Sequence, residues 1–524
     1  MTYDYIVIGA GSAGCVIAAR LTENGKHTVL LLEAGKPDDK QEIRIPAAFS
    51  KLFHTAYDWD FSTEPEAATA NRRLYWPRGK MLGGSSSMNA MMYVRGHRTD
   101  YDQWAQAGNA GWGYDDVLPL FRKSERFVGD DGDAAFHGSD GSLEVSSQRS
   151  PNPLSFAFIA AAESLGLRRL GDVNGASQDG VALTHVNQHR GRRWSAADAF
   201  LRPASKRKNL TVETECLVGA ITFEGRKAVG VSYTRGGAAL HALAGREIVL
   251  CAGAIGSPQL LMLSGVGPAA ALSGHGIPVV ADLPGVGQNL QDHLTSGVSY
   301  ACRVPVSLAS AETLANFARY LLLGRGPLTS NIGEALAFIR TRDGLAAPDI
   351  ELIFAPVYFI EHGAGNPPGH GFTIGTILLR PESRGAITLH SKDAHDAPAI
   401  RPNYLTAPAD LVTLIAGMRF ARRLVAAEAF ASYRGPEVLP GTNIAADDEL
   451  AAFIRQRSDT LYHPVGTCRM GNDPMAVVDS ELRVRGVSGL RVADASIMPT
   501  IIGGHTHAPA VMIGEKAAQM MGAV

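Results

Sequence analysis

The sequence contains little cysteine. Only five cysteines occur among its 524 residues, an odd number dispersed along the chain: Cys15, Cys216, Cys251, Cys302 and Cys468. Small secreted proteins that depend on disulfides carry more cysteines at regular spacings. We therefore expect no disulfide framework and a reducing compartment. The cytoplasm is the expected location, and a peripheral position at the inner membrane stays open.

An excess of either charge is also absent. The chain has 49 Lys and Arg residues against 51 Asp and Glu residues, for a formal net charge of −2. This balance gives no general electrostatic reason to bind nucleic acid. With 45% hydrophobic and 19% charged residues, the composition is that of a folded protein. A chain of this length is expected to form two domains; its oligomeric state does not follow from the sequence.

No uninterrupted hydrophobic run is long enough to cross a membrane. The one long stretch without Lys, Arg, Asp or Glu runs from Ile248 to Ala281, but Pro258, Pro268 and Pro278 divide it. A membrane helix needs about 20 consecutive apolar residues, and proline interrupts helices. We interpret the stretch as buried strand, turn and helix. The N-terminal MTYDYIVIGAG also lacks the basic region and cleavage site of a signal peptide.

Glycine, in contrast, is abundant, and part of it forms an N-terminal phosphate-binding pattern. An apolar strand is expected at 4–8, followed by GAGSAG at 9–14, a helix to about Asn24, and a strand at 28–32 that ends at Glu33. The three glycines permit a tight turn, close approach of a pyrophosphate, and packing of helix on strand. The helix N-terminus offers N–H groups and positive dipole charge to phosphates. The pattern predicts dinucleotide binding, with Glu33 bonding a ribose.

Two later segments favour a flavin dinucleotide. LRVA at 490–493 is predicted to be a strand ending at Asp494, whose carboxylate can accept hydrogen bonds from the ribityl hydroxyls of FAD. RGKMLGGSSSMNAMMYVRGH at 78–97 contains a glycine-serine cluster that lets the chain run close to a ring system or pyrophosphate. A plain turn residue and a glycine-serine loop without a ligand are the alternatives for these two segments.

Longer motifs resemble one family over nearly the whole chain. GKMLGGSSSMNAMMYVRGHRTDYD at 79–102 is similar to the first signature of the glucose-methanol-choline (GMC) flavin oxidoreductases, and GAIGSPQLLMLSGVG at 253–267 to the second. GVGQNLQDH at 285–293, YHPVGTCRMG at 462–471 and PTIIGGHTHAPAVMIGEK at 499–516 also fit. Within the family, the chain resembles bacterial acceptor-dependent alcohol dehydrogenases and choline dehydrogenase-like enzymes.

The resemblance implies a two-domain α/β fold, α+β overall. A Rossmann-like FAD-binding domain would take residues 1–155, 195–305 and 458–524. An interleaved substrate domain, built on an antiparallel sheet, would take residues 156–194 and 306–457.

The sequence agrees with a β-rich substrate domain in outline. Residues 350–358, 371–379 and 386–390 are rich in strand-forming residues and separated by turn residues. Residues 418–427 have helical character. These three runs are therefore expected to form an antiparallel sheet.

The candidate FAD-contacting residues combine the N-terminal pattern with the positions that the resemblance implies. They are Gly9, Gly11, Ser12, Ala13, Gly14, Glu33, Ala34, Arg78, Leu82, Gly83, Ser86, Asn89, Ala90, Met91, Val218, Ala252, Tyr462, Asp494, Ala495, Thr506 and Pro509.

Three histidines are the candidate catalytic residues. Alcohol oxidation by a flavin needs a base for the hydroxyl proton and a hydride acceptor, and a neutral histidine suits the first task. The resemblance implies that His463 is this base and that a second His or Asn precedes the last helix. His507 occupies the second position of an N-x-N motif there and is the expected partner, while His505 occupies the first.

A helix is expected at 508–521, because Pro509 suits its first turn. The positive end of that helix would keep nearby histidines neutral and would stabilise negative charge on reduced flavin. His507 therefore has both a positional and an electrostatic reason to serve the reaction.

The implied activity is oxidation of an alcohol, with a primary alcohol giving an aldehyde. The hydride would pass to flavin N5 and the electrons to a quinone-type or other acceptor, with an oxidase that uses O2 as the alternative. Lyases and flavin photoenzymes on the same fold, and a Rossmann protein that only binds, are the other classes considered. His463, Cys468, His505 and His507 are plausible metal ligands, but their spacing fits no standard zinc motif, so no metal is expected.

Overall fold

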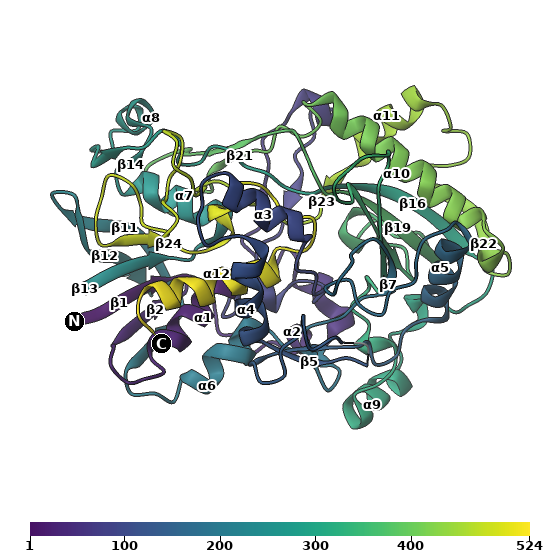
Figure 1. Ribbon diagram of the computed structural model, residues 1–524, viewed down its shortest axis with the longest axis horizontal. Helices are drawn as coiled ribbons and strands as arrows, with labels where there is room; N and C mark the ends of the chain where they lie inside the picture. Colours follow the sequence, from purple (N-terminus) through teal and green to yellow (C-terminus); the bar gives the residue numbers. More distant parts are fainter. Residues whose placement is uncertain (131, 524) are drawn as a thin grey trace.

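Two sheets organise the molecule, and the chain passes between them more than once. The computed structural model describes residues 1–130 and 132–523. One sheet contains the N-terminal strand and lies at one end of the ribbon in Figure 1, and the second sheet lies at the other end. The mixed α/β class predicted from the sequence is confirmed.

The first sheet is built on five parallel strands. Its members are β1 (Thr2–Ile8), β2 (Val29–Leu32), β10 (Leu210–Glu213), β11 (Cys216–Glu224), β12 (Lys227–Arg235), β13 (Ala238–Leu250) and β24 (Leu490–Val492). The order β10-β2-β1-β13 is parallel, β24 adds to β13 in parallel, and β12 is antiparallel to β13 and β11. The central strands carry continuous buried apolar runs, at 5–8, 29–32 and 248–250, because both faces are covered.

Helices near both chain termini cover this sheet. α1 (Ser12–Leu21) packs against α12 (His507–Met520), and α4 (Tyr114–Ser124) packs on α12. Nearly every residue of α1 is buried, because the helix lies between the sheet and α12. α1 ends at Leu21, before the expected Asn24, and α12 begins one residue before the expected Ala508. The first and last parts of the chain therefore form one layer.

The second sheet is antiparallel. Its members are β7 (Gly180–Leu183), β16 (Leu294–Cys302), β17 (Ala335–Ile339), β18 (Ile350–Ala355), β19 (Gly371–Leu378), β22 (Arg434–Leu439) and β23 (Asp459–Thr460). The order is β22-β16-β19-β18-β17-β7, with β23 paired to β16. α10 (Pro408–Ala426) and α5 (Pro153–Ser164) pack against this sheet (Figure 1).

Two of the three predicted β-rich runs form neighbouring strands, β18 and β19, and the third does not join them. β20 (Ala386–Thr388) pairs instead with β21 (Ala399–Arg401) in a separate two-stranded sheet. The reason lies in its backbone, because Ile387 N–H donates to the Gly287 carbonyl at 2.7 Å and Gly385 exchanges hydrogen bonds with Leu290. The segment thus binds the 285–293 motif rather than the second sheet.

The expected domain boundaries stay a prediction. β16 and β23 pair within the second sheet although residues 195–305 and 458–524 were expected in the FAD domain.

The remaining helices and short strands are α2 (Gln41–Arg44), α3 (Arg98–Gln106), α6 (Arg202–Ala204), α7 (Gly253–Leu263), α8 (Ala269–Gly274), α9 (Leu314–Leu323), α11 (Asp447–Arg457), β3 (Phe61–Ser62), β4 (Tyr75–Trp76), β5 (Glu125–Val128), β6 (Leu143–Ser146), β8 (Gln188–His189), β9 (Arg192–Arg193), β14 (Val266–Gly267) and β15 (Ala281–Asp282).

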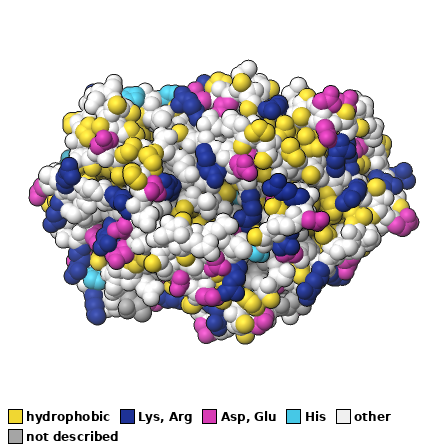
Figure 2. Space-filling model, turned by 45° about the horizontal axis from the view of Figure 1, so that its top comes forward, with side chains coloured by type: hydrophobic (Ala, Val, Ile, Leu, Met, Phe, Trp, Pro, Cys, Tyr) yellow, Lys and Arg dark blue, Asp and Glu magenta, His cyan; other side chains and the backbone are white. Residues whose placement is uncertain are grey.

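The surface matches the balanced composition. On the face drawn in Figure 2, basic and acidic side chains are interspersed and neither sign dominates. Within the described residues, every helix is too short or too polar to span a bilayer.

Candidate active site

One large cavity lies between the carboxyl ends of the parallel strands and one face of the second sheet. Its volume is about 660 Å³. From the first sheet it is lined by Ile8, Gly9, Leu32, Glu33 and Cys251, and from alternate positions of β16, β18 and β19 by Thr295, Gly297, Ser299, Ile353, Ala355, Thr373, Gly375 and Ile377. Side chains alternate across a strand, so this face of the second sheet is free to shape a site while the other packs in the core. The edge where parallel strands end is also where such sheets bind ligands.

The glycines of residues 9–14 have distinct steric roles. Gly9 has φ +100°, and a Cβ added there would lie 2.5 Å from the Cys251 carbonyl oxygen. A Cβ at Gly14 would lie 1.9 Å from the Gly9 carbonyl oxygen, so only glycine lets α1 pack so closely. A Cβ at Gly11 would have its nearest neighbour at 3.9 Å, and no side chain caps the first turn of α1. The Gly11 backbone and the first N–H groups of the helix are thus available to an anion.

Glu33 is buried at the end of β2 and contacts the same loop. Its carboxylate accepts hydrogen bonds from Ala10 N–H and Gly35 N–H, both at 2.8 Å. Burial raises the pKa of Glu33 to about 7, against the lowering effect of these two bonds. The side chain lines the cavity, and its bond to a ribose stays a prediction.

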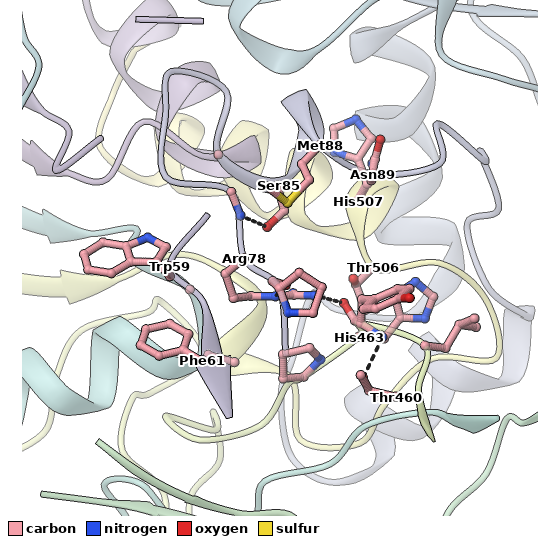
Figure 3. Close-up of a pocket in the computed structure, with 18 of the residues that line it drawn as sticks. Trp59, Phe61, Arg78, Ser85, Met88, Asn89, Thr460, His463, Thr506 and His507 are labelled. Carbon is pink, nitrogen blue, oxygen red and sulfur yellow. Dashed lines mark hydrogen bonds between the residues drawn. The ribbon is translucent and has the colours of Figure 1, made fainter. Parts of the chain in front are cut away.

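The 79–102 signature is held directly against the phosphate-binding loop. Gly83 N–H donates to the Ala10 carbonyl at 2.8 Å. Gly84, at φ +52°, lies so close to Gly11 that an added Cβ would be 2.8 Å from the Gly11 Cα. Arg78 donates to the Tyr462 carbonyl at 2.6 Å (Figure 3). Gly83 and Gly84 therefore join two motifs, and Gly84 also borders the cavity.

Asp494 lies at the end of β24, as predicted, and its carboxylate is well bonded. Gly253 N–H donates at 2.9 Å and Ser257 Oγ at 2.6 Å to one oxygen, and Ser496 N–H donates at 2.8 Å to the other. A carboxylate has about four acceptor positions, so one further donor fits. The contact of that position with a ribityl hydroxyl remains a prediction.

Most of the expected cofactor residues border the cavity, and four do not. Those that do are Gly9, Gly11, Ser12, Ala13, Glu33, Ala34, Arg78, Ser86, Asn89, Ala90, Met91, Val218, Ala252, Tyr462, Asp494, Ala495 and Thr506. Gly14, Leu82, Gly83 and Pro509 lie behind its wall. Gly14 and Gly83 act there through packing and a backbone bond, whereas Ala510, one residue after Pro509, reaches the cavity.

His463 is held at the cavity wall by the 285–293 motif. Its backbone N–H donates to the Asp292 carboxylate at 2.6 Å, and Thr460 Oγ1 donates to the same carboxylate at 2.6 Å. Tyr404 also donates to Asp292. Burial raises the pKa of Asp292 to about 6. Asp292 thus anchors the main chain of His463 without touching its ring.

The ring of His463 is oriented by His293, which is fully buried. His293 Nε2 lies 3.2 Å from the Leu379 carbonyl, and its Nδ1 lies 3.0 Å from His463 Nδ1. Burial, followed by the nearby His505, lowers the pKa of His293 to about 3, so this ring is neutral. A carbonyl only accepts, so Nε2 of His293 carries the hydrogen and its Nδ1 accepts from His463 Nδ1–H. His463 therefore keeps the lone pair on Nε2.

His463 is also neutral. Burial, the charge of His505, and the neighbouring His293 and Arg78 lower its pKa well below the usual value. A neutral imidazole with a free Nε2 at a cavity wall is able to accept a proton.

The structure brings His505, rather than the expected His507, next to His463. The ring centroids of His463 and His505 are 4.9 Å apart. His505 Nε2 lies 3.0 Å from Glu351 Oε1, and the Glu351 side chain, on β18, is fully buried. Glu351 has the same parity along β18 as Ile353 and Ala355, so it reaches the site from the cavity face of the sheet.

His507 lies on the other side of the cavity, beside Asn89 and Met88 in Figure 3. It is the first residue of α12, and its Nδ1 is 2.8 Å from Ser12 Oγ at the start of α1. Burial, with a smaller effect of Arg193, lowers its pKa to about 4. The expected neutral state is present, but burial is its main cause, whereas a helix-end effect was predicted.

Three residues around these histidines did not emerge from the sequence. Asp292 and His293 belong to the 285–293 motif, which the sequence identified only through the family resemblance. The signal available there was the Asp-His pair itself, two polar side chains able to bond a histidine elsewhere in the chain. Glu351 is a lone acid in an otherwise apolar strand, IELIFA. A charged residue on a buried strand requires a partner, and that requirement could have indicated a second polar group in the site.

Comparison with known proteins defines the family. A family model described as GMC oxidoreductase matches residues 3–295, and the C-terminal model of the same description matches residues 381–514. The chain is 44% identical to the alcohol dehydrogenase (acceptor) of Pseudomonas putida over 99% of its length and 95% of that protein. It is also 44% identical to an oxygen-dependent choline dehydrogenase of Brucella suis, with the same coverage.

Solved structures agree. Pyridoxine 4-oxidase from Mesorbium loti superposes with a TM-score of 0.90 at 36% identity and covers 98% of each chain. A formate oxidase of Aspergillus oryzae, from a study of FAD modification, superposes with a TM-score of 0.93 at 29% identity over 99% of this chain and 98% of that one. The chain belongs to the GMC oxidoreductase family and is an FAD-dependent enzyme that acts on CH–OH groups.

The residues present fit FAD. The open Gly11 backbone and the uncapped start of α1 suit its pyrophosphate. Within the described residues, Nε2 of His507 is buried at the cavity wall with no hydrogen-bond partner. An unpartnered buried polar atom is destabilising unless a ligand supplies a partner.

Proposed function

We propose that the protein oxidises an uncharged alcohol, with a primary alcohol giving an aldehyde, and passes the electrons to a quinone-type acceptor. FAD, when bound, accepts the hydride that leaves the alcohol carbon. The protein's own residues bind the hydroxyl group, take its proton and hold the negative charge that develops on oxygen. The observation that carries this proposal is the hydrogen-bonded chain from the Leu379 carbonyl through His293 to Nδ1 of His463, which leaves Nε2 of His463 to accept a proton.

His463 is the proposed base. Its Nδ1 is committed to His293, so the hydroxyl proton goes to Nε2. A positioned general base contributes about 10²–10⁴ in rate. Because the His463 pKa is lowered, the base stays unprotonated below the pH at which a free histidine would be half charged.

His505 is the proposed hydrogen-bond donor to the substrate oxygen. Its Nε2–H donates to the buried Glu351 carboxylate, which holds the ring beside His463. In this role a hydrogen on Nδ1 would be shared with the alkoxide-like oxygen as His463 removes the hydroxyl proton. His507, bonded to Ser12, supports the cofactor side of the cavity instead.

The charges around the cavity favour an uncharged substrate. The carboxylates in its lining are Glu33, Glu361, Asp459 and Asp494. Glu33 and Asp494 accept backbone or hydroxyl hydrogens, Asp459 is 3.0 Å from His362 Nε2, and Glu361 is 2.8 Å from Arg457. Each is therefore already partnered, and the sheet face offers Ile353, Ala355 and Ile377. None of these four carboxylates is therefore left free to face the charge of a quaternary ammonium group.

Relatives support both possible acceptors. The Pseudomonas putida relative is named for an unspecified acceptor and the Brucella suis relative for oxygen. We favour the quinone-type acceptor and treat O2 as the second candidate.

The test is reduction of the bound flavin without air, using a panel of apolar primary alcohols, polar alcohols and choline. Apolar primary alcohols should bleach the flavin fastest, and the reduced enzyme should be reoxidised faster by a soluble quinone than by air. Faster reoxidation by air would make the protein an oxidase. No bleaching by any alcohol would contradict the proposal and favour a lyase or photoenzyme on this fold.

A second experiment separates the two candidate partners of His463. His505→Ala should slow anaerobic flavin reduction more than His507→Ala, because only His505 lies against His463. His505→Asn should recover part of the rate, since an amide can still donate to the substrate oxygen. His507→Ala should instead lower FAD retention. The reverse order of rates would assign the second role to His507.

A further inference from the structure

The helix α9 exposes an unusual amount of hydrocarbon to solvent. Leu314 is 89% exposed, Leu322 82%, Leu323 63% and Leu321 49%. These four leucines lie within the ten residues of the helix, whereas the other exposed large apolar residues are scattered. Single exposed apolar residues are normal, but a contiguous exposed patch indicates an interaction surface.

Three of the four exposed leucines share one face, and another side of the helix anchors it. Leu314, Ala318, Leu321 and Leu322 follow helical spacing and are all exposed. Tyr320 is buried, and with Phe317 it packs on a small apolar cluster that includes Ile45, Ala48 and Leu328. The helix is therefore fixed to the molecule by one side and apolar on the other, and it projects at the lower edge of Figure 1.

Basic side chains border this face. Arg319, Arg325, Arg149, Arg190 and Arg192 are all exposed. Arg149 donates to the Gly324 carbonyl at 2.7 Å, the Gly324 backbone packs on that of Arg190, and Arg192 lies beside Tyr320.

The border carries no compensating acid. In the described part of the chain, none of the five arginines is within 4 Å of a carboxylate. Residues 313–333 contain no Asp or Glu, and the preceding Glu312 is paired with Lys51 at 2.6 Å. Positive charge without a nearby carboxylate thus gathers beside the C-terminal half of α9.

We propose that α9 is a peripheral membrane-binding element that inserts its leucines into the surface of an anionic lipid bilayer. Interfacial helices combine an apolar face, buried at the boundary of headgroups and acyl chains, with Arg or Lys that contact lipid phosphates. A second copy of the chain is a poorer occupant, because a two-fold contact through this face would oppose two sets of arginines. The proposal does not depend on which alcohol is oxidised.

The position of α9 relates this surface to the cavity. η1 (Pro46–Leu52) follows Ile45 in the chain. Its Ala47 and Ala48 belong to the apolar cluster under α9, while its Phe49 lines the cavity. η1 would therefore separate a bilayer bound at α9 from the cavity. Apolar compounds dissolve in a bilayer, so they would be concentrated on this side of the molecule.

The test is flotation of the holoenzyme with vesicles of phosphatidylcholine alone and of phosphatidylcholine with phosphatidylglycerol. The protein should float with the anionic vesicles, and high salt should weaken binding. The double variant Leu314→Ser/Leu322→Ser should lower the bound fraction about tenfold or more, since each buried methylene contributes to insertion. Arg319→Glu/Arg325→Glu should abolish the preference for anionic lipid.

A matched control uses exposed apolar residues elsewhere. Leu243→Ser/Val412→Ser changes residues that are 51% and 67% exposed, and it should bind vesicles as the parent does. All variants should keep their flavin and its rate of reduction by alcohol, which shows that they are folded. Binding that is absent in the parent, or equal in the leucine variant, would overturn the proposal. The proposal would also be overturned if the parent did not float with vesicles and instead formed a concentration-dependent dimer that the leucine substitutions dissociate.

Discussion

Two buried histidine clusters in this protein have opposite electrostatics. In the cavity wall, His463 contacts another histidine, His293, and its pKa is lowered by burial and by the neighbouring histidines and Arg78. Behind the 79–102 signature, His137 lies between Glu125, at 3.0 Å, and Asp172, at 2.8 Å. Burial opposes charge there too, but the bonds to the two carboxylates outweigh it and raise the pKa of His137.

The difference shows how one residue type serves two purposes. Both rings are buried, so burial alone does not decide the protonation state. In the second cluster, Arg95 also bonds Glu125 at 2.7 Å, and the charges form a closed network that ties β5 to the loop at 172. In the first, the nearby Asp292 contacts only the backbone of His463, and Glu351 contacts only His505. Keeping carboxylates off the His463 ring is what leaves it a neutral base.

Removing the base should have the largest effect. His463→Ala should slow anaerobic flavin reduction by an alcohol about 10²–10⁴-fold, because it removes the Nε2 lone pair that accepts the hydroxyl proton. Stopped-flow absorbance at the flavin band measures this rate, and the flavin-to-protein ratio confirms that FAD is retained. A variant that reduces its flavin as fast as the parent would remove His463 from the mechanism.

Breaking the second cluster should affect stability and leave chemistry alone. Asp172→Asn removes one carboxylate from a buried charged network, which typically costs about 3–5 kcal/mol in the free energy of unfolding. Denaturant titration of the holoenzyme measures the loss. The rate of flavin reduction per bound flavin should stay that of the parent, and a rate loss comparable to that of His463→Ala would show that the clusters are coupled.

The tautomer of His463 can be tested through His293. His293→Leu deprives His463 Nδ1–H of its acceptor and releases the ring, so flavin reduction should slow about 10²-fold, as for small misplacements of reacting groups. His293→Asn is the matched variant, because its side-chain oxygen can accept at the place of Nδ1 and should restore much of the rate. Equal rates in the two variants would mean that His293 only fills space.

His507, a cavity histidine outside both clusters, and His137 should also respond to pH with opposite sign. His507 in the cavity has a folded pKa of about 4, below the unfolded value of about 6.5. The unfolded chain therefore binds a proton as pH falls below about 6.5 and the folded chain does not, which destabilises the fold by about 2 kcal/mol between pH 7 and 5.

His507→Asn should remove that loss, so its unfolding midpoint should depend less on pH in acid than that of the parent. His137, with a raised pKa, contributes stability at acidic pH that disappears as pH rises through its folded value. His137→Asn should accordingly lose more stability at pH 6 than at pH 9, and an identical loss at both would place a neutral ring in the second cluster.

Local motifs determined much of this protein from the sequence alone. The spacing of Gly9, Gly11 and Gly14 between an apolar strand and an apolar helix is sufficient to predict the dinucleotide-binding unit, because strand, turn, helix and acid all lie within about thirty residues. The signatures at 79–102 and 253–267, with His463 in its own motif, indicated FAD and the proposed base through their resemblance to a known family. Each is a short segment whose residue types indicate its chemistry before the groups that pack around it are known.

Only the tertiary structure decided which histidine stands beside His463. His505 and His507 are two residues apart, but α12 begins at His507, so that ring turns to Ser12 while His505, in the preceding loop, reaches Glu351 and His463. Glu351 is 154 residues from His505 in the chain, and His293 is 170 from His463. Contacts over such separations depend on how two sheets and the last helix pack, and burial and charge at a histidine follow from that packing.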